Sequence, residues 1–336
     1  MLKIAVIGAG SVGFTRKLLR DILAVPEFAD TEFRFMDISP ANLDMSSNLC
    51  SKIVQDSNLP ATVLPFSSQR EAIRGADYVL CVVRVGGLEA FAHDVEIPLK
   101  YGVDQCVADT LGPGGIFYHQ RTLPVLLDIA ADMREVAPDA LLINYANPMA
   151  MNSWGMRRAG GVRYLGLCHG VEGGHALIAR ALGLPTEEVD IVCAGINHQT
   201  WYIQVTHNGM DMTPSILEAM EDNPDNAARE PCRIDVLRRF VYISTESNGH
   251  LSEYLPWYRK RLDEINDWID LGSWINGETG GYLRVCTEGR NWFEHDFPNW
   301  MQQPPLEFTP ESRGHEHGSR IVEGLETGRL YRGHFN

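Results

Sequence analysis

The chain opens with alternating strand and helix patterns. The run Lys3–Ile7 is apolar and rich in β-branched residues, as is typical of a central parallel strand that is covered on both faces. A helical pattern continues to about Leu23, and Glu32–Met36 forms a second strand that is followed by Asp37. Two further apolar runs predict strands of the same sheet: Tyr78–Val83 and Leu141–Asn144. Because strands and helices alternate, we expect an α/β fold with a doubly wound parallel sheet.

The pattern changes beyond about residue 150. The runs Tyr164–Leu167 and Ile191–Ala194 each stop at a group of polar residues. Helical periodicity over Ile216–Asp270 is interrupted by an Asn/Asp/Pro-rich stretch at Glu221–Pro231, and Glu311–Thr327 is predicted to form the last helix. We therefore expect two domains, with the parallel sheet in residues 1–150 and an α+β substrate domain in residues 151–336.

A glycine-rich turn follows the first strand and opens the first helix. Its glycines permit a tight turn and a close approach of backbone N–H groups to a pyrophosphate at the positive helix end. The carboxylate of Asp37 can accept hydrogen bonds from both ribose hydroxyls and would repel a 2′-phosphate. The pattern predicts an NAD site in a Rossmann-type domain, although such a turn also occurs without a nucleotide. The predicted binding residues are Gly8, Gly10, Ser11, Val12, Gly13 and Asp37.

Three polar clusters each follow an apolar run, which would place them at the carboxyl ends of strands, where open α/β sheets bind ligands. They are Asn147-Pro148, Cys168-His169 and Asn197-His198. A thiolate and an imidazole are a workable ligand pair for a divalent metal. Each residue also has a purely structural interpretation, since cysteine is often a small buried hydrophobe. The Gly/Pro-rich loop Asp109–Gly115 is ambiguous in the same way.

Composition limits the classes of partner. The 44 acidic and 29 basic side chains give a formal net charge of −15, which repels nucleic acid and anionic membranes. No stretch approaches the roughly 20 apolar residues that a membrane span needs, and the N-terminal sequence runs directly into a predicted strand. The seven cysteines are odd in number and form no CxxC pair, which argues against a disulfide framework. We expect a cytoplasmic protein that binds neither nucleic acid nor membrane.

Several long motifs occur in a characteristic order over nearly the whole chain. They are GAGSVGFT, FMDISP, VRVGGLEA, ADTLGPGGI, INYANPMAMN, GLCHGVEG, AGINHQTWY and TESNGHLSEYLPWYRK. With these motifs the chain resembles glycoside hydrolase family 4, most closely its α-galactosidase (melibiase) and α-glucosidase branch. This family is the NAD-dependent exception among glycosidases, most of which use two carboxylates. The resemblance implies a homo-oligomeric glycosidase that needs NAD and a divalent metal, usually Mn²⁺.

The resemblance also implies a mechanism of oxidation and elimination. NAD would take a hydride from C3 of the sugar, and the metal would polarise the resulting ketone. A base would then remove the C2 proton, the C1–oxygen bond would break, water would add, and NADH would return the hydride. The reaction would therefore be a hydrolysis without net oxidation.

The family motifs imply roles for individual residues. Cys168 and His198 would bind the metal, and Asp109 would assist the leaving group. The C2 base should come from the segment Thr245–Tyr254, where Glu246, His250 and Glu253 are all candidates. Sugar contacts are implied for Asn147, His169 and Asn197. Contacts near the nicotinamide are implied for Arg84 and Gly86.

Two features depart from the family pattern. Gly170-Val171 replaces the Ser-Val that follows Cys-His in the melibiase branch, and this glycine is similar to the uronic-acid-specific members. An α-glucosidase or α-uronidase is therefore an alternative, whereas His169 argues against a phosphorylated sugar. The chain ends at Asn336, where relatives continue with further helices. We expect either a longer native protein or a small substrate domain.

Two other functions compete with the glycosidase. One is a 2-hydroxy acid dehydrogenase of the lactate or malate type, whose fold has the same glycine turn, the acid after the second strand and an Asn-Pro after a later strand. Such an enzyme would need an arginine clamp and a His/Asp pair, which have no convincing counterpart in this sequence. The other is a catalytically inactive NAD-binding protein.

Overall fold

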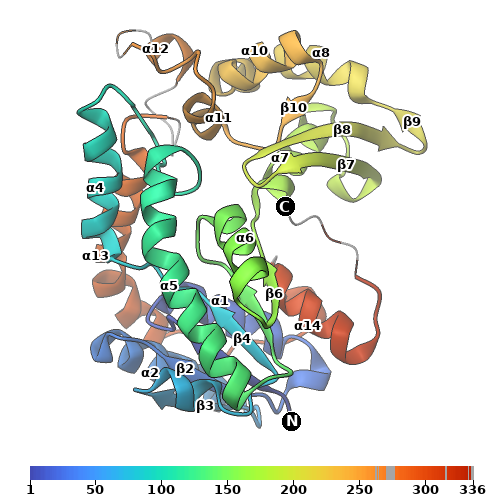
Figure 1. The fold of residues 1–336 in the computed structure, drawn as a ribbon. Coiled ribbons are helices and arrows are strands. Elements are labelled where there is room, and N and C mark those ends of the chain that lie inside the picture. The colour runs from blue at the N-terminus through green and yellow to red at the C-terminus, as the bar shows by residue number, and fades with distance from the viewer. Residues whose placement is uncertain (262, 264, 270–276, 315, 332, 334–336) are drawn as a thin grey trace. The chain divides into compact units, whose positions relative to one another are not determined.

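The computed structural model describes residues 1–336 except 262, 264, 270–276, 315, 332 and 334–336 (Figure 1). The chain forms two compact units whose segments alternate along the sequence. The first unit comprises Met1–Val85, Arg121–Leu167 and Glu288–Gly333, and the second comprises Gly86–Gln120 and Cys168–Thr287. A functional division at residue 150 stays a prediction, because the compact units are not two consecutive halves of the chain.

The first unit contains the predicted parallel sheet. Its strand order is β3-β2-β1-β4-β5-β6, which is the order of the Rossmann fold. All five strand pairs are parallel, so the predicted α/β fold is confirmed. The strands are β1 (Lys3–Ile7), β2 (Glu32–Met36), β3 (Thr62–Phe66), β4 (Tyr78–Cys81), β5 (Leu141–Asn144) and β6 (Arg163–Gly166).

The predicted strands of this sheet agree with the structure to within two residues, but one edge strand was missed. The bounds of β1, β2 and β5 agree with the predictions, whereas β4 ends two residues earlier than Val83 and β6 begins one residue before Tyr164. Strand β3 was not predicted. It is a partly exposed edge strand with Pro65 in its interior, and proline in a strand is confined to such edges because it cannot donate to the ladder.

Helices pack against this sheet through apolar stripes. In α5 (Gly112–Val136) the buried residues Leu126, Ile129, Ala130 and Met133 recur at helical spacing and join the core cluster of β1, β4 and β5. Full burial of a Leu, Ile or Met side chain contributes about 1.5–3 kcal/mol. The other helices that lie wholly in this unit are α1 (Val12–Leu23), α2 (Pro40–Asp56), α3 (Gln69–Ile73), α6 (Met149–Ala159) and α14 (His317–Thr327).

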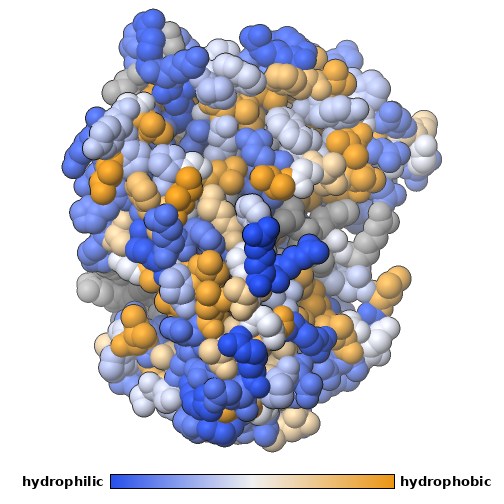
Figure 2. All heavy atoms as spheres, viewed as in Figure 1, coloured by the Kyte–Doolittle hydropathy of each residue, from blue (hydrophilic) through white to orange (hydrophobic). Residues whose placement is uncertain are grey.

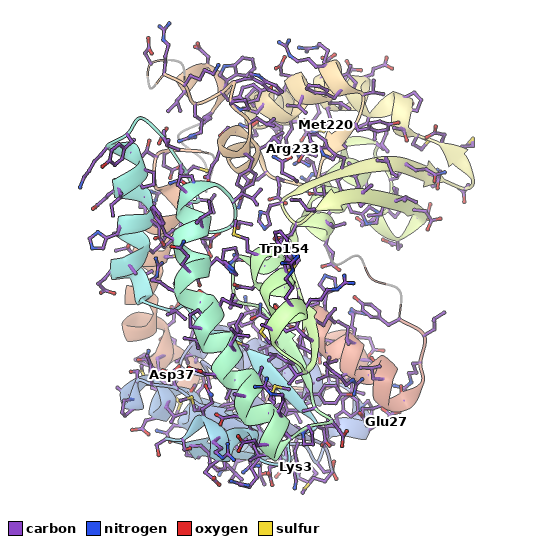
Figure 3. All side chains as sticks on the ribbon, in the orientation of Figure 1. Lys3, Glu27, Asp37, Trp154, Met220 and Arg233 are labelled. Atoms are coloured by element: carbon purple, nitrogen blue, oxygen red, sulfur yellow. The ribbon has the colours of Figure 1, made fainter. Side chains whose placement is uncertain are left out.

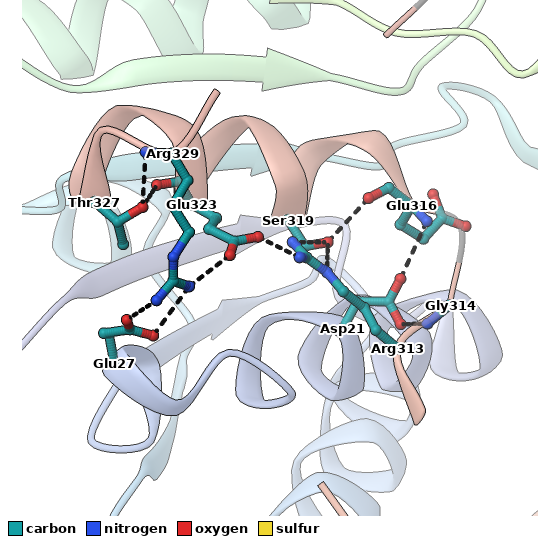
Figure 4. Close-up of polar contacts among 9 residues, drawn as sticks. All are labelled: Asp21, Glu27, Arg313, Gly314, Glu316, Ser319, Glu323, Thr327 and Arg329. Carbon is teal, nitrogen blue, oxygen red and sulfur yellow. Dashed lines mark hydrogen bonds and ion pairs between the residues drawn. The ribbon is translucent and has the colours of Figure 1, made fainter. Parts of the chain in front are cut away.

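The last helix is tied to α1 by polar contacts (Figure 4). The carboxylate of Asp21 accepts hydrogen bonds from the backbone of Gly314 at 2.8 Å and of Glu316 at 3.1 Å. Helix α14 begins at His317, six residues later than predicted, because Pro310–Ser312 forms a separate 3₁₀ turn with its own capping box. Further contacts in Figure 4 join Arg313 to Ser319 and Glu323, and Arg329 to Glu27, Glu323 and Thr327.

The second unit is built on an antiparallel sheet, in agreement with the predicted α+β class. Its strands run in the order β10-β8-β7, and β9 pairs with β8. Strands β7 and β8 are joined by the two-residue turn Asn197-His198, since Ile196 pairs with Gln199. The expectation that Asn197-His198 lies at the edge of an open parallel sheet was therefore wrong. The strands are β7 (Val189–Ile196), β8 (Gln199–His207), β9 (Met210–Asp211) and β10 (Ile243–Ser244).

Helices cover the buried face of this sheet. Residues of α7, α8 and α10 pack around Tyr202 and Val205 in one core cluster. The predicted interruption after Glu221 is confirmed, but it holds a short helix, α9.

The outer face of the hairpin carries the exposed residues Val192, Ile196 and Ile203, and hydrophobic spheres gather over β7 and β8 in Figure 2. The helices that contribute to this unit are α4 (Gly87–Leu99), α7 (Gly170–Ala181), α8 (Ile216–Glu221), α9 (Pro224–Arg229), α10 (Pro231–Phe240), α11 (Asn248–Tyr254), α12 (Ile265–Trp268) and α13 (Gly281–Met301).

Part of the predicted helical region Ile216–Asp270 lies outside the described residues, namely 262, 264 and 270. Within the described part of the chain, no helix combines the length and the apolar character needed to cross a membrane.

Candidate active site

The glycine turn after β1 is held by hydrogen bonds to the end of β2 and to Asp37. Gly8 adopts a left-handed φ of 90° and donates its N–H to Met36 O at 2.9 Å. Gly10 donates to Asp37 Oδ2 at 2.8 Å, and a Cβ on Gly10 would lie 2.6 Å from that carboxylate. Since real Cβ contacts are essentially never that short, a side chain at residue 10 would displace Asp37. The binding of a pyrophosphate by this turn stays a prediction.

The residues beside the turn leave donors and acceptors for a ligand. Helix α1 begins at Val12, and Ser11 is its N-cap without a side-chain capping bond, so N–H groups of the first turn can face an anion. Asp37 lies beyond the end of β2 (Figure 3) and accepts from Ser39 N at 2.8 Å through Oδ1. Each of its oxygens accepts one backbone bond and retains a lone pair for a ribose hydroxyl. A Cβ on Gly13 would meet Trp300 at 3.3 Å.

Two more predicted residues follow neighbouring strands of this sheet. Arg84 lies three residues after β4, and Asn147 lies three residues after β5, where it forms a cis peptide with Pro148. Both therefore lie beyond the carboxyl ends of the strands, as does the glycine turn. Gly86 is the N-cap of α4 in the second unit and has a left-handed φ of 82°.

The structure brings the two predicted metal ligands together in the second unit. Sγ of Cys168 lies 3.3 Å from Nε2 of His198. Cys168 precedes α7, and its sulfur accepts from Gly170 N at 3.4 Å. The buried residue His198 occupies the hairpin turn with a left-handed φ of 62°, a conformation that is uncommon outside glycine. Strain of this kind persists where surrounding structure holds it, often at functional sites.

The other nitrogen of His198 faces a carboxylate. Nδ1 lies 2.9 Å from Oε2 of Glu246, so Nε2 is left for a metal beside Cys168. A metal-bound histidine commonly donates its second N–H to such a carboxylate, which fixes its tautomer and orientation. The segment that carries Glu246 is held by buried Arg233, labelled in Figure 3, which donates to Ser244 O at 2.8 Å.

Electrostatics favour a thiolate in this cluster. Burial alone would raise the pKa of the Cys168 thiol, but the hydrogen bond and charge of His198 outweigh burial and lower this pKa. Burial alone would lower the pKa of His198, but Glu246 and Cys168 raise it well above its usual range. Burial would raise the pKa of Glu246, and the facing His198 lowers it to about 2. The three side chains are therefore electrostatically coupled, and each one shifts the pKa of its neighbour toward the charged form.

Helix α11 adds two more polar groups to this cluster. The rings of His250 and His198 lie 5.2 Å apart, and the Tyr254 hydroxyl lies 3.4 Å from His198 Nδ1. Burial lowers the pKa of His250, against the opposing effect of Glu246, so a neutral imidazole is favoured there. Ligand atoms of His198, Glu246 and His250 all lie within 4.8 Å of one another. The sequence interpretation missed Tyr254, although its i, i+4 spacing from His250 places both on one helix face.

The remaining predicted residues, Asp109, Asn197 and His169, differ in their burial. Asp109 is buried and accepts from Thr110 Oγ1 at 2.8 Å. The loop that contains it ends at once in α5, since Gly112 begins that helix. Asn197 is buried in the hairpin turn, whereas His169 is exposed at the N-cap of α7.

Glu253 does not face His198. Its two carboxylate oxygens accept from the backbone N–H groups of Val107 at 2.6 Å and Ala108 at 3.0 Å. Burial raises the pKa of Glu253 to about 7, although these two N–H groups oppose the shift. Of the three candidates for the C2 base, Glu246 and His250 therefore lie beside His198, and Glu253 contacts the Asp109 loop.

Comparison with known proteins places the chain in a family. The model of the family 4 glycosyl hydrolases matches residues 3–184, and the model of their C-terminal domain matches residues 193–336. A solved 6-phospho-β-glucosidase from Thermotoga maritima, crystallised with manganese, NAD⁺ and glucose-6-phosphate, has the same fold. Its TM-score is 0.72 at 21% identity, over 97% of this chain and 73% of that one.

Relatives of higher sequence identity agree with this match. The chain is 55% identical over 336 residues to an α-galactosidase of Rhizobium meliloti, which covers 99% of this chain and 69% of the relative. It is 35% identical to an α-galactosidase of Bacillus subtilis, over 97% of this chain and 74% of the relative. The chain therefore belongs to family 4 of the glycosyl hydrolases.

Proposed function

We propose that this glycosidase hydrolyses α-galactosides with the help of NAD and a divalent metal. The proposed metal is Mn²⁺. The proposal of an α-galactoside as substrate rests on the 55% identity to an α-galactosidase over 99% of the chain. The solved relative with manganese and NAD⁺ supports both cofactors. The family match also favours a glycosidase over a 2-hydroxy acid dehydrogenase or an inactive NAD-binding protein.

The residues of each unit fit one of the two cofactors. In the first unit, a side chain at residue 10 would collide with the Asp37 carboxylate, and that carboxylate keeps acceptor capacity for a ribose. In the second unit, the soft sulfur of Cys168 and Nε2 of His198 lie 3.3 Å apart and suit a borderline divalent ion. We therefore assign NAD to the glycine turn and the metal to the Cys168–His198 pair.

Bound NAD would accept the hydride from C3 of the sugar, and the metal would act as a Lewis acid toward the carbonyl formed there. Cys168 and His198 hold the metal, and Glu246 keeps His198 in the tautomer that presents Nε2. Asn147, His169 and Asn197 bind the sugar, while Arg84 and Gly86 flank the nicotinamide.

Other side chains carry out the two proton transfers, which are removal of the C2 proton and protonation of the departing oxygen. His250 and Tyr254 present a nitrogen and a hydroxyl toward His198 from one face of α11, so they are the groups positioned to take a proton next to the metal. Glu246 is engaged with His198 at 2.9 Å, which favours an orienting role. Asp109 donates a proton to the departing oxygen.

The sugar itself has a specific alternative. Gly170 is similar to the glycine of uronic-acid-specific members, and more distant relatives of the chain include an α-galacturonidase and an α-glucosidase. We also propose that the enzyme works in the cytoplasm as a homo-oligomer, a dimer or tetramer. Light scattering coupled to size exclusion measures that oligomeric state.

The test is the release of nitrophenol from nitrophenyl α-galactoside, α-glucoside, α-galacturonide and α-glucuronide under reducing conditions, with and without NAD and Mn²⁺. We expect release from the galactoside that depends on both cofactors and is abolished in Cys168→Ser. In deuterated water, the galactose product should carry deuterium at C2, because that proton is removed and replaced. Release without NAD and without exchange at C2 would overturn the mechanism, and preference for a uronide would change the substrate.

A further inference from the structure

The carboxylate of Glu253 clamps the loop that leads into Asp109. Its Oε2 and Oε1 accept from the consecutive N–H groups of Val107 and Ala108 at 2.6 and 3.0 Å. Ala108 adopts a left-handed φ of 58°, which is unfavourable for a residue with a Cβ. Consecutive N–H groups that converge on one anion form a concavity of the kind that binds anions elsewhere. The two oxygens of Glu253 therefore hold this turn at consecutive N–H groups.

The same loop is anchored upstream of the clamp. Asp104 forms a buried ion pair with Arg259 at 2.7 Å, and the Gln105 side chain accepts from Gly114 N at 3.0 Å. The carbonyl of Gln105 accepts from Gly280 N at 2.9 Å. The Cys106 carbonyl also accepts from Tyr282 N at 3.0 Å. Each residue from Asp104 to Ala108 thus has a fixed contact, and Glu253 provides the last of them before Asp109.

Helix α11 connects this clamp to the metal cluster. His250 and Tyr254 face His198 from one side of the helix, while Glu253 faces Val107 and Ala108. Three residues of a seven-residue helix therefore contact two different parts of the proposed site. A shift of α11 would move both parts together, and loss of the clamp would release the loop alone.

We propose that Glu253 is a positioning residue of the glycosidase reaction, which holds the backbone of Val107 and Ala108 so that Asp109 meets the departing oxygen. This inference rests on the proposed role of Asp109. Both oxygens of Glu253 are engaged by backbone donors, so it does not take the C2 proton. Its effect on the reaction passes through the loop geometry.

The substitution Glu253→Gln tests the clamp. The amide keeps the length of the side chain, but only its oxygen accepts, and its NH₂ group faces a backbone N–H. We expect kcat for an alkyl or disaccharide α-galactoside, with a poor leaving group, to fall by at least about tenfold, because small misplacement of a reacting group is costly. For nitrophenyl α-galactoside, whose leaving group needs little protonation, the fall should be several times smaller. KM and Mn²⁺ affinity should change by less than about threefold.

Asp109→Asn and the double variant complete the experiment. If Glu253 acts through Asp109, the two substitutions will not be additive, so Glu253→Gln in the Asp109→Asn background will have little further effect. Val205→Ala is the control for general loosening, because it removes packing from the other core cluster of the second unit, whose described members include no residue of α11 or of the Asp109 loop. It should lower the melting temperature and leave the leaving-group dependence unchanged.

The outcomes separate the two hypotheses. Equal losses for both substrates in Asp109→Asn would overturn the role of Asp109. Two other results would overturn the positioning role of Glu253 and leave the role of Asp109 intact. One is a leaving-group effect that appears in Asp109→Asn but not in Glu253→Gln. The other is strict additivity of the two substitutions.

Discussion

Oε1 of Glu246 lies 2.7 Å from the point where a Cβ would stand on Gly170. Real Cβ atoms essentially never approach another atom so closely, so glycine lets the start of α7 pack against the carboxylate that orients His198. The departure of Gly170 from the serine of the melibiase branch is therefore coupled to the position of Glu246. Any other residue after Cys168-His169 requires the carboxylate to move.

Substituting Gly170 by alanine should weaken metal binding. The added methyl group displaces Glu246 from Nδ1 of His198, and loss of such an outer partner typically lowers metal affinity about 10–100-fold. Titration with Mn²⁺ followed by calorimetry measures this change. Gly173 lies on the same helix, and among the described residues no atom would lie within 4 Å of its Cβ. Gly173→Ala is thus the matched control, and equal affinities in the two variants would contradict the coupling.

Substituting Gly10 by alanine should weaken NAD binding strongly while leaving metal binding intact. The new Cβ would lie 2.6 Å from the Asp37 carboxylate, so either the turn or the acid must leave its place. We expect the Kd for NAD to rise by at least about 100-fold, which is about 2.7 kcal/mol at 25 °C. Fluorescence or calorimetric titration with NAD gives the Kd, and an unchanged value would contradict the assignment of the turn to the nucleotide.

Glu253 should make the stability of the protein pH-dependent between about pH 4.5 and 7. Its pKa is raised from 4.5 to about 7 by burial, with Val107 and Ala108 opposing the shift. In this window the folded state keeps a proton that the unfolded state releases, so the free energy of unfolding falls as pH rises. The stabilisation is complete below pH 4.5 and lost above pH 7, and its size is at most about 3 kcal/mol.

Urea unfolding of the wild type and of Glu253→Gln at a series of pH values isolates this contribution. The variant lacks the titrating group, so the difference between the two free energies of unfolding should change across the window. A constant difference from pH 4.5 to 7.5 would show that Glu253 titrates at its ordinary pKa in the folded state.

Cys168 should be alkylated before Cys193 in the metal-free protein. Both thiols are partly exposed, but His198 outweighs burial and lowers the pKa of Cys168, whereas burial raises the pKa of Cys193 to about 11. Because the thiolate is the nucleophile, iodoacetamide at pH 7.5 should modify Cys168 faster, as peptide mass spectrometry can quantify. Mn²⁺ should protect Cys168, and equal rates at the two cysteines would contradict the proposed thiolate.

Local patterns in the sequence predicted the first strands, the glycine turn and the first helix well. Strand β1, the glycine turn, helix α1 and Asp37 follow one another within 40 residues, and each step depends on near neighbours: apolar runs, glycine spacing and an acid after a strand. In contrast, β8 was missed because its turn, Asn197-His198, lacks the glycine that marks most two-residue hairpins. The partly exposed edge strand β3 was missed because Pro65 interrupts its pattern.

The sequence by itself determined the family, the Rossmann-type sheet and the types of side chain from which a metal site could be built. Tertiary structure decided which of these side chains meet. Cys168 and His198 are 30 residues apart, and a hairpin turn brings them to 3.3 Å. Glu253 and Val107 are 146 residues apart, and their pairing changes Glu253 from a candidate base to an anchor. The physical reason is that periodicity encodes which face of an element is buried, whereas the partner of a buried polar group depends on how distant elements pack.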